Sequence, residues 1–268
     1  MGIHNRWLVA ALLTIGAWGA AATPTEHDTS RMVLAQPGEI PILITAPHGG
    51  YEAIPGVPPR RAGKTLRDKN TLEIAEALAD AVQERLGKRP YVVAARFARL
   101  YIDANRAASQ AFDTAEAPPY YEAYHRQIAN YVSELKQKHP GGALLLDIHG
   151  QSTDNRAIYR GTRHGSTVSR LLERFGCAAL TGEKSLFGVL AIKGHRVIPT
   201  NIPDDCLFEE DRYVGGFTVA TYGSHHRTGI DAIQIELGGD FRRTTAITAD
   251  LAEAVSVFYK TYLDEHQK

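Results

Sequence analysis

Two histidines follow short apolar runs, at points where buried strands are predicted to end. His48 comes after residues 41–46 and precedes two glycines, and His149 comes after residues 143–148 and precedes one. Imidazole is the commonest metal ligand in proteins, and catalytic zinc sites use three protein ligands and leave a fourth position open. Two such strand ends in one chain therefore predict a zinc site. Asp147 shares a strand face with His149 and could orient that histidine from behind.

The third metal ligand is expected to be a carboxylate, and two residues qualify. Glu52 lies four residues after His48 on the same predicted loop, whereas Asp68 lies near the start of the first long predicted helix. Each has an ordinary alternative role, because Asp68 could cap that helix and Glu52 could be a solvated loop acid. The spacing alone leaves both open.

Glu236 lies in an apolar run, residues 232–237, that is typical of another buried strand ending in glycine. Burial of a carboxylate is unfavourable unless it has a partner or a function. Amide hydrolysis needs a base to deprotonate water and an acid to protonate the leaving amine, and one glutamate can do both. Glu236 is therefore the candidate catalytic group. The alternative is a salt bridge with Arg106 or Arg242.

Asn105 and Arg106 form a pair of hydrogen-bond donors after an extended segment. A guanidinium can bind a substrate carboxylate through two parallel hydrogen bonds, or stabilise a developing oxyanion. We expect Arg106 to act in both catalysis and substrate binding, with Asn105 as a further donor. Two more residues are candidates for substrate binding: Arg242, which follows Glu236 closely, and, with a weaker case, His125 on a tyrosine-rich helix.

Predicted strands and helices alternate along the chain. Apolar runs predict strands over residues 41–46, 91–95, 143–148 and 232–237. Helical spacing of apolar residues predicts helices over residues 68–86, 119–138, 166–175 and 246–263. This alternation predicts a single α/β domain with a mostly parallel central sheet. Because sites in such sheets lie outside the carboxyl ends of the strands, His48, His149 and Glu236 are expected to converge at one rim.

Composition excludes several classes of protein. The chain has 268 residues, of which 44% are hydrophobic, with 30 basic and 30 acidic side chains. Such a chain is too apolar for disorder, and its zero net charge lacks the electrostatic signature of a nucleic-acid-binding protein. The chain has no Gly-x-Ser-x-Gly motif, which argues against a serine hydrolase.

The first 22 residues have the layout of a secretory signal peptide. Arg6 precedes an apolar stretch, residues 7–21, that ends at a small-residue cleavage site, residues 20–22. An uncleaved anchor is the alternative. We expect residues 23–268 to form one secreted or periplasmic catalytic domain that has no membrane segment after cleavage. Export would permit a disulfide between Cys177 and Cys206.

Taken together, six short motifs resemble those of the N-formylglutamate amidohydrolase family. They occur in the family's order, and the resemblance runs from about residue 41 to the C-terminal helix, which is most of the chain expected after cleavage. The motifs are Ala-Pro-His-Gly-Gly (46–50), Ile-Pro (54–55), Arg-Asp-Lys-Asn-Thr (67–71), Asp-Ala-Asn-Arg (103–106), Asp-Ile-His-Gly (147–150) and Gln-Ile-Glu-Leu (234–237).

The resemblance implies a phosphorylase/hydrolase-like fold similar to that of the zinc carboxypeptidases, with a mixed sheet flanked by helices. It implies one zinc ion held by His48, His149 and Asp68, with Glu236 as the catalytic glutamate. The carboxypeptidases take their acidic ligand shortly after the first histidine, which keeps Glu52 as an alternative. The pair at residues 105–106 resembles the Asn-Arg pair that holds carboxylate and oxyanion in those enzymes.

Two departures bear on the substrate. The first motif has glycine where the amidohydrolases more often have serine, and the chain carries an export signal. The prediction is therefore hydrolysis of an amide bond next to a carboxylate, in an N-acyl amino acid, a peptide or a glutamyl-type substrate. The alternative is an exported ligand-binding or non-catalytic member of the same fold. The expected partner is a small molecule or peptide carrying a carboxylate, and neither nucleic acid nor membrane.

Overall fold

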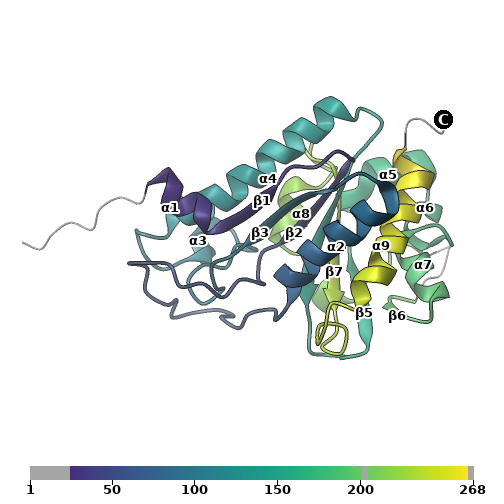
Figure 1. The fold of residues 1–268 in the computed structure, drawn as a ribbon. Coiled ribbons are helices and arrows are strands. Elements are labelled where there is room, and N and C mark those ends of the chain that lie inside the picture. The colour runs from purple at the N-terminus through teal and green to yellow at the C-terminus, as the bar shows by residue number, and fades with distance from the viewer. Residues whose placement is uncertain (1–24, 201–204, 265–268) are drawn as a thin grey trace, which may run out of the picture.

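In the computed structural model, which describes residues 25–200 and 205–264, a seven-stranded mixed sheet runs through the protein (Figure 1). Its strands are β1 (Val33–Gln36), β2 (Ile42–Ala46), β3 (Tyr91–Ala95), β4 (Leu144–Gly150), β5 (Ala157–Gly161), β6 (Arg196–Ile198) and β7 (Asp231–Leu237). Their order is β1-β3-β2-β4-β7-β5-β6. The four strands β3, β2, β4 and β7 are parallel, whereas β1 is antiparallel to β3 and β5 to β7. The predicted α/β fold with a mixed, mostly parallel sheet is confirmed.

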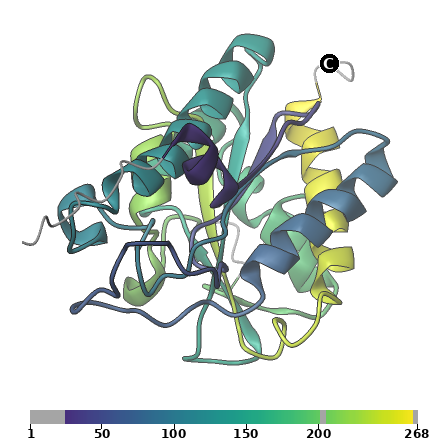
Figure 2. The same ribbon diagram turned by 60° about the vertical axis from the view of Figure 1, so that its left-hand side comes forward.

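Helices cover both faces of this sheet (Figures 1 and 2). They are α1 (Glu26–Arg31), α2 (Thr71–Leu86), α3 (Ala108–Ala111), α4 (Pro118–Lys138), α5 (Ser169–Phe175), α6 (Ala178–Thr181), α7 (Leu186–Ile192), α8 (Phe217–Tyr222) and α9 (Ile247–Phe258). Helices α2 and α9 lie on one face, and α4 lies on the other.

The sheet has a hydrophobic core on each face, which explains why its central strands are continuously apolar. In β2, Ile42 and Ile44 pack on the side of α2 and α9, whereas Leu43 packs on the side of α4. Every residue of β2 is buried. Strands that are covered on both faces have no position at which a polar residue reaches solvent, so their sequences do not alternate between apolar and polar residues.

Several boundaries differ from the predicted ones in ways that affect the site. Helix α2 begins at Thr71, after Asn70 in a left-handed conformation, so Asp68 is outside the helix and Asn70 takes the cap position. Asp68 contributes to the start of this helix only through its main-chain carbonyl, which accepts hydrogen bonds from the amide and hydroxyl groups of Thr71. Strand β4 extends to Gly150, which places His149 within the strand.

Other differences lie in elements that the apolar pattern missed or shortened. The predicted helix over residues 166–175 begins as a 3-10 turn, Ser166–Val168, and the last helix ends in a π turn, Tyr259–Leu263. Strands β1, β5 and β6 and the short helices α7 and α8 were not predicted. These elements are too short to show a clear period.

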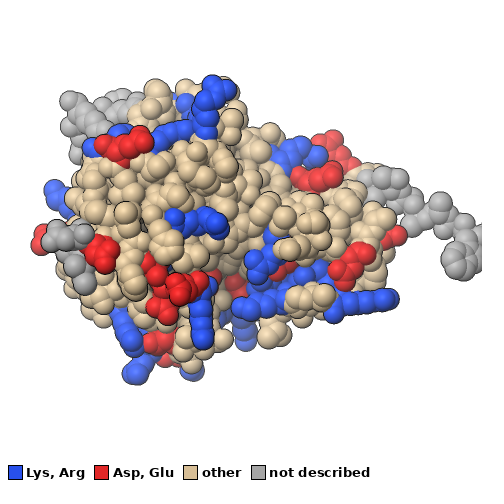
Figure 3. Space-filling view, turned by 180° about the vertical axis from the view of Figure 1, so that it is seen from behind, with Lys and Arg blue, Asp and Glu red and all other residues tan. Residues whose placement is uncertain are grey.

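The predicted signal peptide lies outside the described residues. Within the described ranges, no single helix is long and apolar enough to cross a membrane, although the bent pair Ser166–Phe175 and Ala178–Ile192 reaches that length and composition together. On the face drawn in Figure 3, both Lys and Arg and Asp and Glu side chains are present at the surface.

The two glycines after His48 allow the chain to leave β2 through a narrow space. A Cβ at Gly49 would lie 2.2 Å from the amide nitrogen of Leu72, and a Cβ at Gly50 would lie 2.4 Å from the carbonyl oxygen of Ala95. Real Cβ atoms do not approach the main chain this closely. The turn that presents His48 therefore depends on the absence of side chains at both positions.

The substitution Gly50→Ala is expected to lower the free energy of unfolding by about 3 kcal/mol, because the new methyl group would overlap main-chain atoms that cannot rotate away. Urea unfolding followed by circular dichroism measures the change. An unchanged unfolding midpoint would contradict the close approach of this turn to β3.

Candidate metal centre and cavity

Strand register brings the candidate residues to one edge of the sheet. Along β4 and β7, His149 pairs with Glu236 and Asp147 pairs with Gln234. His48 follows β2, the neighbour of β4 on its other side. Because β2, β4 and β7 are parallel, their carboxyl ends lie side by side. The predicted convergence at one rim is therefore what the register produces.

His48, Asp68 and His149 form a compact group that could hold a metal ion. Their candidate ligand atoms all lie within 4.8 Å of one another. Each histidine places its Nδ1 atom 3.3 Å from the same oxygen, Oδ2 of Asp68. The loop that carries Asp68 returns to the strand end, because the Asp68 amide donates to the His48 carbonyl (3.0 Å).

Two further carboxylates hold the histidines from behind. The Nε2–H of His48 donates to Asp103 (2.6 Å), and the Nε2–H of His149 donates to Asp147 (2.8 Å). Asp103 and Asp147 accept but do not donate, so each Nε2 carries a proton. Each Nδ1 can then share a further proton with Asp68 or, without that proton, offer its lone pair to a cation. This carboxylate–histidine arrangement orients imidazoles as metal ligands, and the donor set therefore fits a divalent cation.

Asp103 and Asp147 are themselves fixed in place. Arg99 donates to Asp103 from Nε (3.0 Å) and from a terminal nitrogen (2.8 Å), and the hydroxyl of Thr45 donates to Asp147 (2.6 Å). Asp147 had been predicted as an outer partner of His149. Asp103 and Arg99 were not predicted in such a role, because an irregular segment rather than a strand carries them to the site.

The electrostatics of the group favour positive charge at its centre. Burial by itself would raise the pKa of Asp68, but hydrogen bonds from His149 and His48 outweigh it and hold that pKa well below its ordinary value. Burial would lower the pKa of His149, yet the adjacent Asp147 and Asp68 carboxylates raise it well above its ordinary value. Burial also opposes ionisation of Asp103, whose pKa is nevertheless lowered by His48 and Arg99.

Glu52, the alternative third ligand, is not part of this group. Its main chain pairs with Phe97 in an isolated bridge, its amide donates to Arg96, and its carbonyl accepts from Ala98. Through these main-chain bonds, Glu52 connects the loop that follows His48 to the chain that follows β3. Of the two candidates, Asp68 is the one that the fold brings to the histidines.

Glu236 faces the same rim and is almost fully buried. Its carboxylate accepts a hydrogen bond from the side-chain amide of Gln234 (2.9 Å), and Gln234 in turn accepts from the amide of Gly216 (2.7 Å). Burial raises the pKa of Glu236. Among the described residues, no ion pair joins Glu236 to Arg106 or Arg242, so the salt-bridge alternative is not realised.

Asn105 and Arg106 border the cavity in different ways. The side-chain oxygen of Asn105 accepts from the amide (2.7 Å) and hydroxyl (3.1 Å) of Thr218, which turns its amide nitrogen toward His149 at 3.2 Å. Arg106 is exposed and lines the cavity. Within the described ranges, no hydrogen bond or ion pair involves its guanidinium group.

Arg242 and His125 take places other than those expected for substrate-binding residues. The guanidinium of Arg242 donates to three main-chain carbonyls, those of Leu237, Lys69 and Gln151. Arg242 also lines the cavity, and its hydrogen bonds there join the segments that carry these three carbonyls. His125 is outside the cavity lining, and it bonds to the carbonyl of Ala104 (3.0 Å).

A cavity of about 710 Å³ opens onto these groups. Its lining contains more basic than acidic side chains: the acids are Asp68 and Glu236, and the bases are Lys64, Arg67, Arg99, Arg106, Arg212 and Arg242. Arg99 and Arg242 are engaged by protein groups, as described above. The two carboxylates of the lining thus belong to the metal group or lie beside it, and the other charged groups of the lining are basic.

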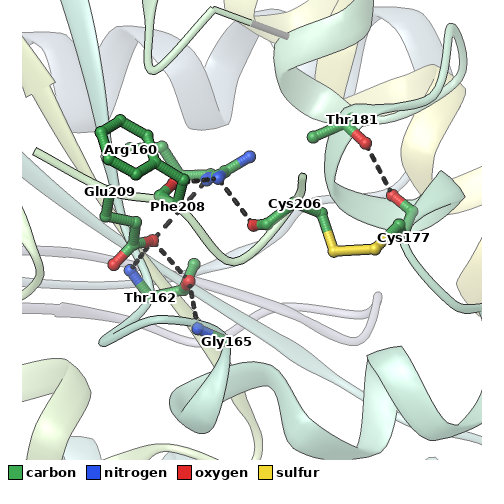
Figure 4. Close-up of a disulfide and its surroundings, with 8 residues drawn as sticks. All are labelled: Arg160, Thr162, Gly165, Cys177, Thr181, Cys206, Phe208 and Glu209. Atoms are coloured by element: carbon green, nitrogen blue, oxygen red, sulfur yellow. Dashed lines mark hydrogen bonds and ion pairs between the residues drawn. A yellow bond between two sulfur atoms is a disulfide. The ribbon is translucent and has the colours of Figure 1, made fainter. Parts of the chain in front are cut away.

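One wall of the cavity is held by a disulfide. Residues 212–216 line the cavity, and the segment that leads to them starts at Cys206, which is bonded to Cys177 at the start of α6 (Figure 4). Buried Arg160 donates to the carbonyls of Cys206 (2.7 Å) and Phe208 (3.0 Å). The sequence predicted that these cysteines could pair, but not that their bond would anchor a wall of the site.

The same segment is fixed by a buried carboxylate. Glu209 accepts hydrogen bonds from the amide of Thr162 (2.6 Å) and the amide of His164 (2.9 Å), and it lies 3.6 Å from Arg160. Burial raises the pKa of Glu209, although these donors oppose the shift. The disulfide and this carboxylate together hold the wall that presents Arg212 and Tyr213 to the cavity.

Solved structures share this architecture. An N-formylglutamate amidohydrolase from Ralstonia eutropha JMP134 matches with a TM-score of 0.53 and 18% sequence identity, over 84% of this chain and 94% of that one. The chain has an N-formylglutamate amidohydrolase-like fold. The gene product Atu2144 from Agrobacterium tumefaciens matches with a TM-score of 0.58 and 14% identity, over 92% of this chain and 100% of that one. No family model and no curated protein sequence matches the chain.

At these identities the likeness establishes the fold alone. The amidohydrolase-like fold that the sequence motifs implied is therefore confirmed. The roles of individual residues have to be argued from the geometry of this site.

Metal binding is expected to depend on the three grouped residues and not on Glu52. In equilibrium dialysis against Zn²⁺, the protein should bind about one equivalent, and His48→Ala and His149→Ala should bind none. Asp103→Asn should weaken binding by roughly 10- to 100-fold, because it loosens the orientation of His48. Glu52→Gln is the matched control and should bind like the wild type. Loss of metal in Glu52→Gln with retention in Asp68→Asn would reverse the assignment.

Removal of the disulfide is expected to destabilise the fold without altering the metal group. The bond closes a sequence separation of 29 residues, so the variant Cys177→Ser/Cys206→Ser should lose about 3 kcal/mol of unfolding free energy. Its Zn²⁺ stoichiometry should be unchanged, since the three grouped residues lie on other segments. Denaturant titrations with and without reductant measure the loss. Reductant should lower the unfolding free energy of the wild type alone. An equal decrease in both proteins would contradict a stabilising role for the disulfide.

Proposed function

We propose that this chain is an exported, zinc-dependent amidohydrolase that cleaves an amide bond next to a carboxylate. One observation carries the proposal: Glu236, Asn105 and Arg106 line the same cavity as the His48–Asp68–His149 group. A base, hydrogen-bond donors and a candidate metal group in one cavity are the components that metal-assisted amide hydrolysis requires. The substrate class is an N-acyl amino acid, a peptide or a glutamyl-type compound.

Zinc held by His48, Asp68 and His149 would supply Lewis acidity, polarising the amide carbonyl and making a water molecule more acidic. Asp103 and Asp147 keep the Nδ1 atoms of the two histidines directed at that position. Two imidazoles and one carboxylate leave space for a water or substrate oxygen in a four-coordinate site.

Glu236 would transfer the proton. It takes a proton from the attacking water and delivers it to the nitrogen of the departing amine. Its burial suits this role, because the raised pKa brings the carboxylate closer to the basicity that proton transfer near neutral pH demands. Gln234 fixes the carboxylate by donating to one of its oxygens, so its direction is set before substrate binds.

Arg106 and Asn105 would bind the substrate and its developing charge. The Arg106 guanidinium can engage a carboxylate through two parallel hydrogen bonds, or support the oxyanion of the tetrahedral state. Asn105 offers an amide nitrogen whose direction is fixed by Thr218. Lys64, Arg67 and Arg212 add positive charge around the cavity, which favours anionic substrates.

Two observations support the choice of substrate class and compartment. The Ralstonia structure with a similar fold is named an N-formylglutamate amidohydrolase, and that substrate is an N-acyl amino acid. The disulfide is of a kind that persists in oxidising compartments, in keeping with export through residues 1–22.

The proposal is tested with N-formyl-L-glutamate, N-acetyl-L-glutamate and γ-glutamyl dipeptides as substrates. The zinc-loaded wild type should hydrolyse at least one, and Glu236→Gln should retain zinc and lose nearly all turnover. Glu84→Gln, on the exposed face of α2, is the matched control. Binding of these compounds without hydrolysis would instead favour a ligand-binding member of the fold. Normal turnover in Glu236→Gln would remove the assigned role.

Activity should fall on the acid side at a pH above the ordinary range of a glutamate. As the pH decreases through the raised pKa of Glu236, the carboxylate becomes protonated and can no longer accept a proton from water. The pH dependence of kcat/KM between pH 4 and 9 measures this limb. A rate that stays constant down to pH 4 would exclude a buried glutamate as the base.

A further inference from the structure

Helix α4 holds the main chain on both sides of Asn105. The hydroxyl of Tyr121 donates to the carbonyl of Arg106 (2.8 Å), and the Nε2–H of His125 donates to the carbonyl of Ala104 (3.0 Å). Tyr121 and His125 are four residues apart, so they lie on the same face of the helix. Their rings are in contact, with centroids 4.3 Å apart.

The orientation of His125 is fixed by its own partner. Its Nδ1 atom lies 3.0 Å from the hydroxyl of Tyr222 in α8, whose single proton can point to that nitrogen or to the carbonyl of His125, also 3.0 Å away. Burial lowers the pKa of His125 to about 4, so the ring is neutral at ordinary pH. Because the Ala104 carbonyl can only accept, the neutral ring carries its proton on Nε2, and Nδ1 is left as an acceptor for the Tyr222 hydroxyl.

The two side chains on this segment differ in how they are held. The amide group of Asn105 has its own anchor in Thr218, whereas the guanidinium of Arg106 has no partner within the described ranges. The position of the Arg106 side chain therefore depends on the main chain that carries it. That main chain is held at its carbonyl by Tyr121 and at its amide, which donates to the carbonyl of Asp103 (3.1 Å). The bond from Tyr121 is the one that a side chain of α4 supplies.

We propose that Tyr121 and His125 are positioning residues that set the direction of Arg106 toward the cavity. The proposal rests on the proposed function in that Arg106 is taken to bind the substrate or its oxyanion. It also gives His125 a role other than the direct substrate contact that its sequence context suggested.

Helix α4 offers a matched control for the hydroxyl of Tyr121. Tyr124 is fully buried on the same helix, and among the described residues its hydroxyl has no hydrogen-bond partner. Tyr121→Phe and Tyr124→Phe each remove one oxygen from a buried ring of α4, but only the first removes a bond to the Arg106 segment. Any general effect of losing a hydroxyl from this helix should appear in both variants.

The first measurement is hydrogen exchange at the amides of residues 105–107. Exchange should be about fivefold faster in Tyr121→Phe, the effect of one net hydrogen bond, and unchanged in Tyr124→Phe. His125→Gln, which keeps a donor, should exchange more slowly than His125→Ala. Equal exchange in Tyr121→Phe and Tyr124→Phe would overturn the proposal, whether or not the protein is an amidohydrolase.

The second measurement is a double-mutant cycle between Tyr121→Phe and Arg106→Ala, with N-formyl-L-glutamate as the probe. Tyr121→Phe should lower kcat/KM about fivefold in the wild-type background and have little effect when Arg106 is already alanine. Zinc content should be equal in all four proteins, because Arg99 holds Asp103 separately. A Tyr121→Phe loss that is undiminished in the Arg106→Ala background would overturn the proposal.

The exchange measurement and the double-mutant cycle distinguish failure of the positioning role from failure of the proposed function. If the wild type hydrolyses no amide, the proposed function fails, and the cycle is then measured in the Kd for N-formyl-L-glutamate. Coupling in Kd together with selective exchange in Tyr121→Phe would still support the positioning role. Absence of coupling would overturn it.

Discussion

Two imidazole nitrogens and one carboxylate oxygen converge at the rim of the sheet, and the surrounding structure positions them. Asp103 and Asp147 accept from the Nε2 atoms of His48 and His149, so both Nδ1 atoms are directed at one oxygen of Asp68. Acceptors that face one another at about 3 Å repel unless positive charge lies between them. A proton on His149 can supply such a charge, which is why the pKa of Asp68 is lowered and the pKa of His149 is raised. A divalent metal ion would supply more positive charge at the same position, which four separate segments of the chain help to define.

The parallel sheet brings these residues together although they are far apart in the sequence. Adjacent parallel strands end at one edge, so β2 and β4 deliver the two histidines, and β7 delivers Glu236 opposite His149. The strands are buried on both faces and cannot slip in register without burying polar residues in the wrong core. The elements that bring Asp68 and Asp103 are irregular, and they are fixed by hydrogen bonds: the Asp68 amide to His48, and Arg99 to Asp103.

This division explains what could be predicted from sequence. The histidines come after apolar runs and Glu236 lies near the end of one, so their positions at strand ends follow from pattern and topology. Sequence spacing could not separate Asp68 from Glu52, because the answer depends on how a 20-residue excursion returns to His48. Sequence spacing also could not predict the role of Arg242. Its charge suggested a substrate contact, but its guanidinium donates to three main-chain carbonyls. The wall at residues 212–216 depends on a disulfide and a buried Arg160–Glu209 pair that no local pattern reveals.

The charged groups in and around the cavity fall into two sets, one that is paired within the protein and one that is not. The carboxylates lie beside the metal group, where Asp103 and Asp147 hold the histidines and Glu236 is buried, and each is matched by a specific donor. The bases at Lys64, Arg106 and Arg212 line the cavity and have no carboxylate partner among the described residues. In the proposed function, the unpaired bases would attract a substrate anion and the carboxylates beside the metal group would repel it. This separation of charge would hold a substrate carboxylate near the bases and leave the neutral amide bond next to it as the part that can approach Glu236.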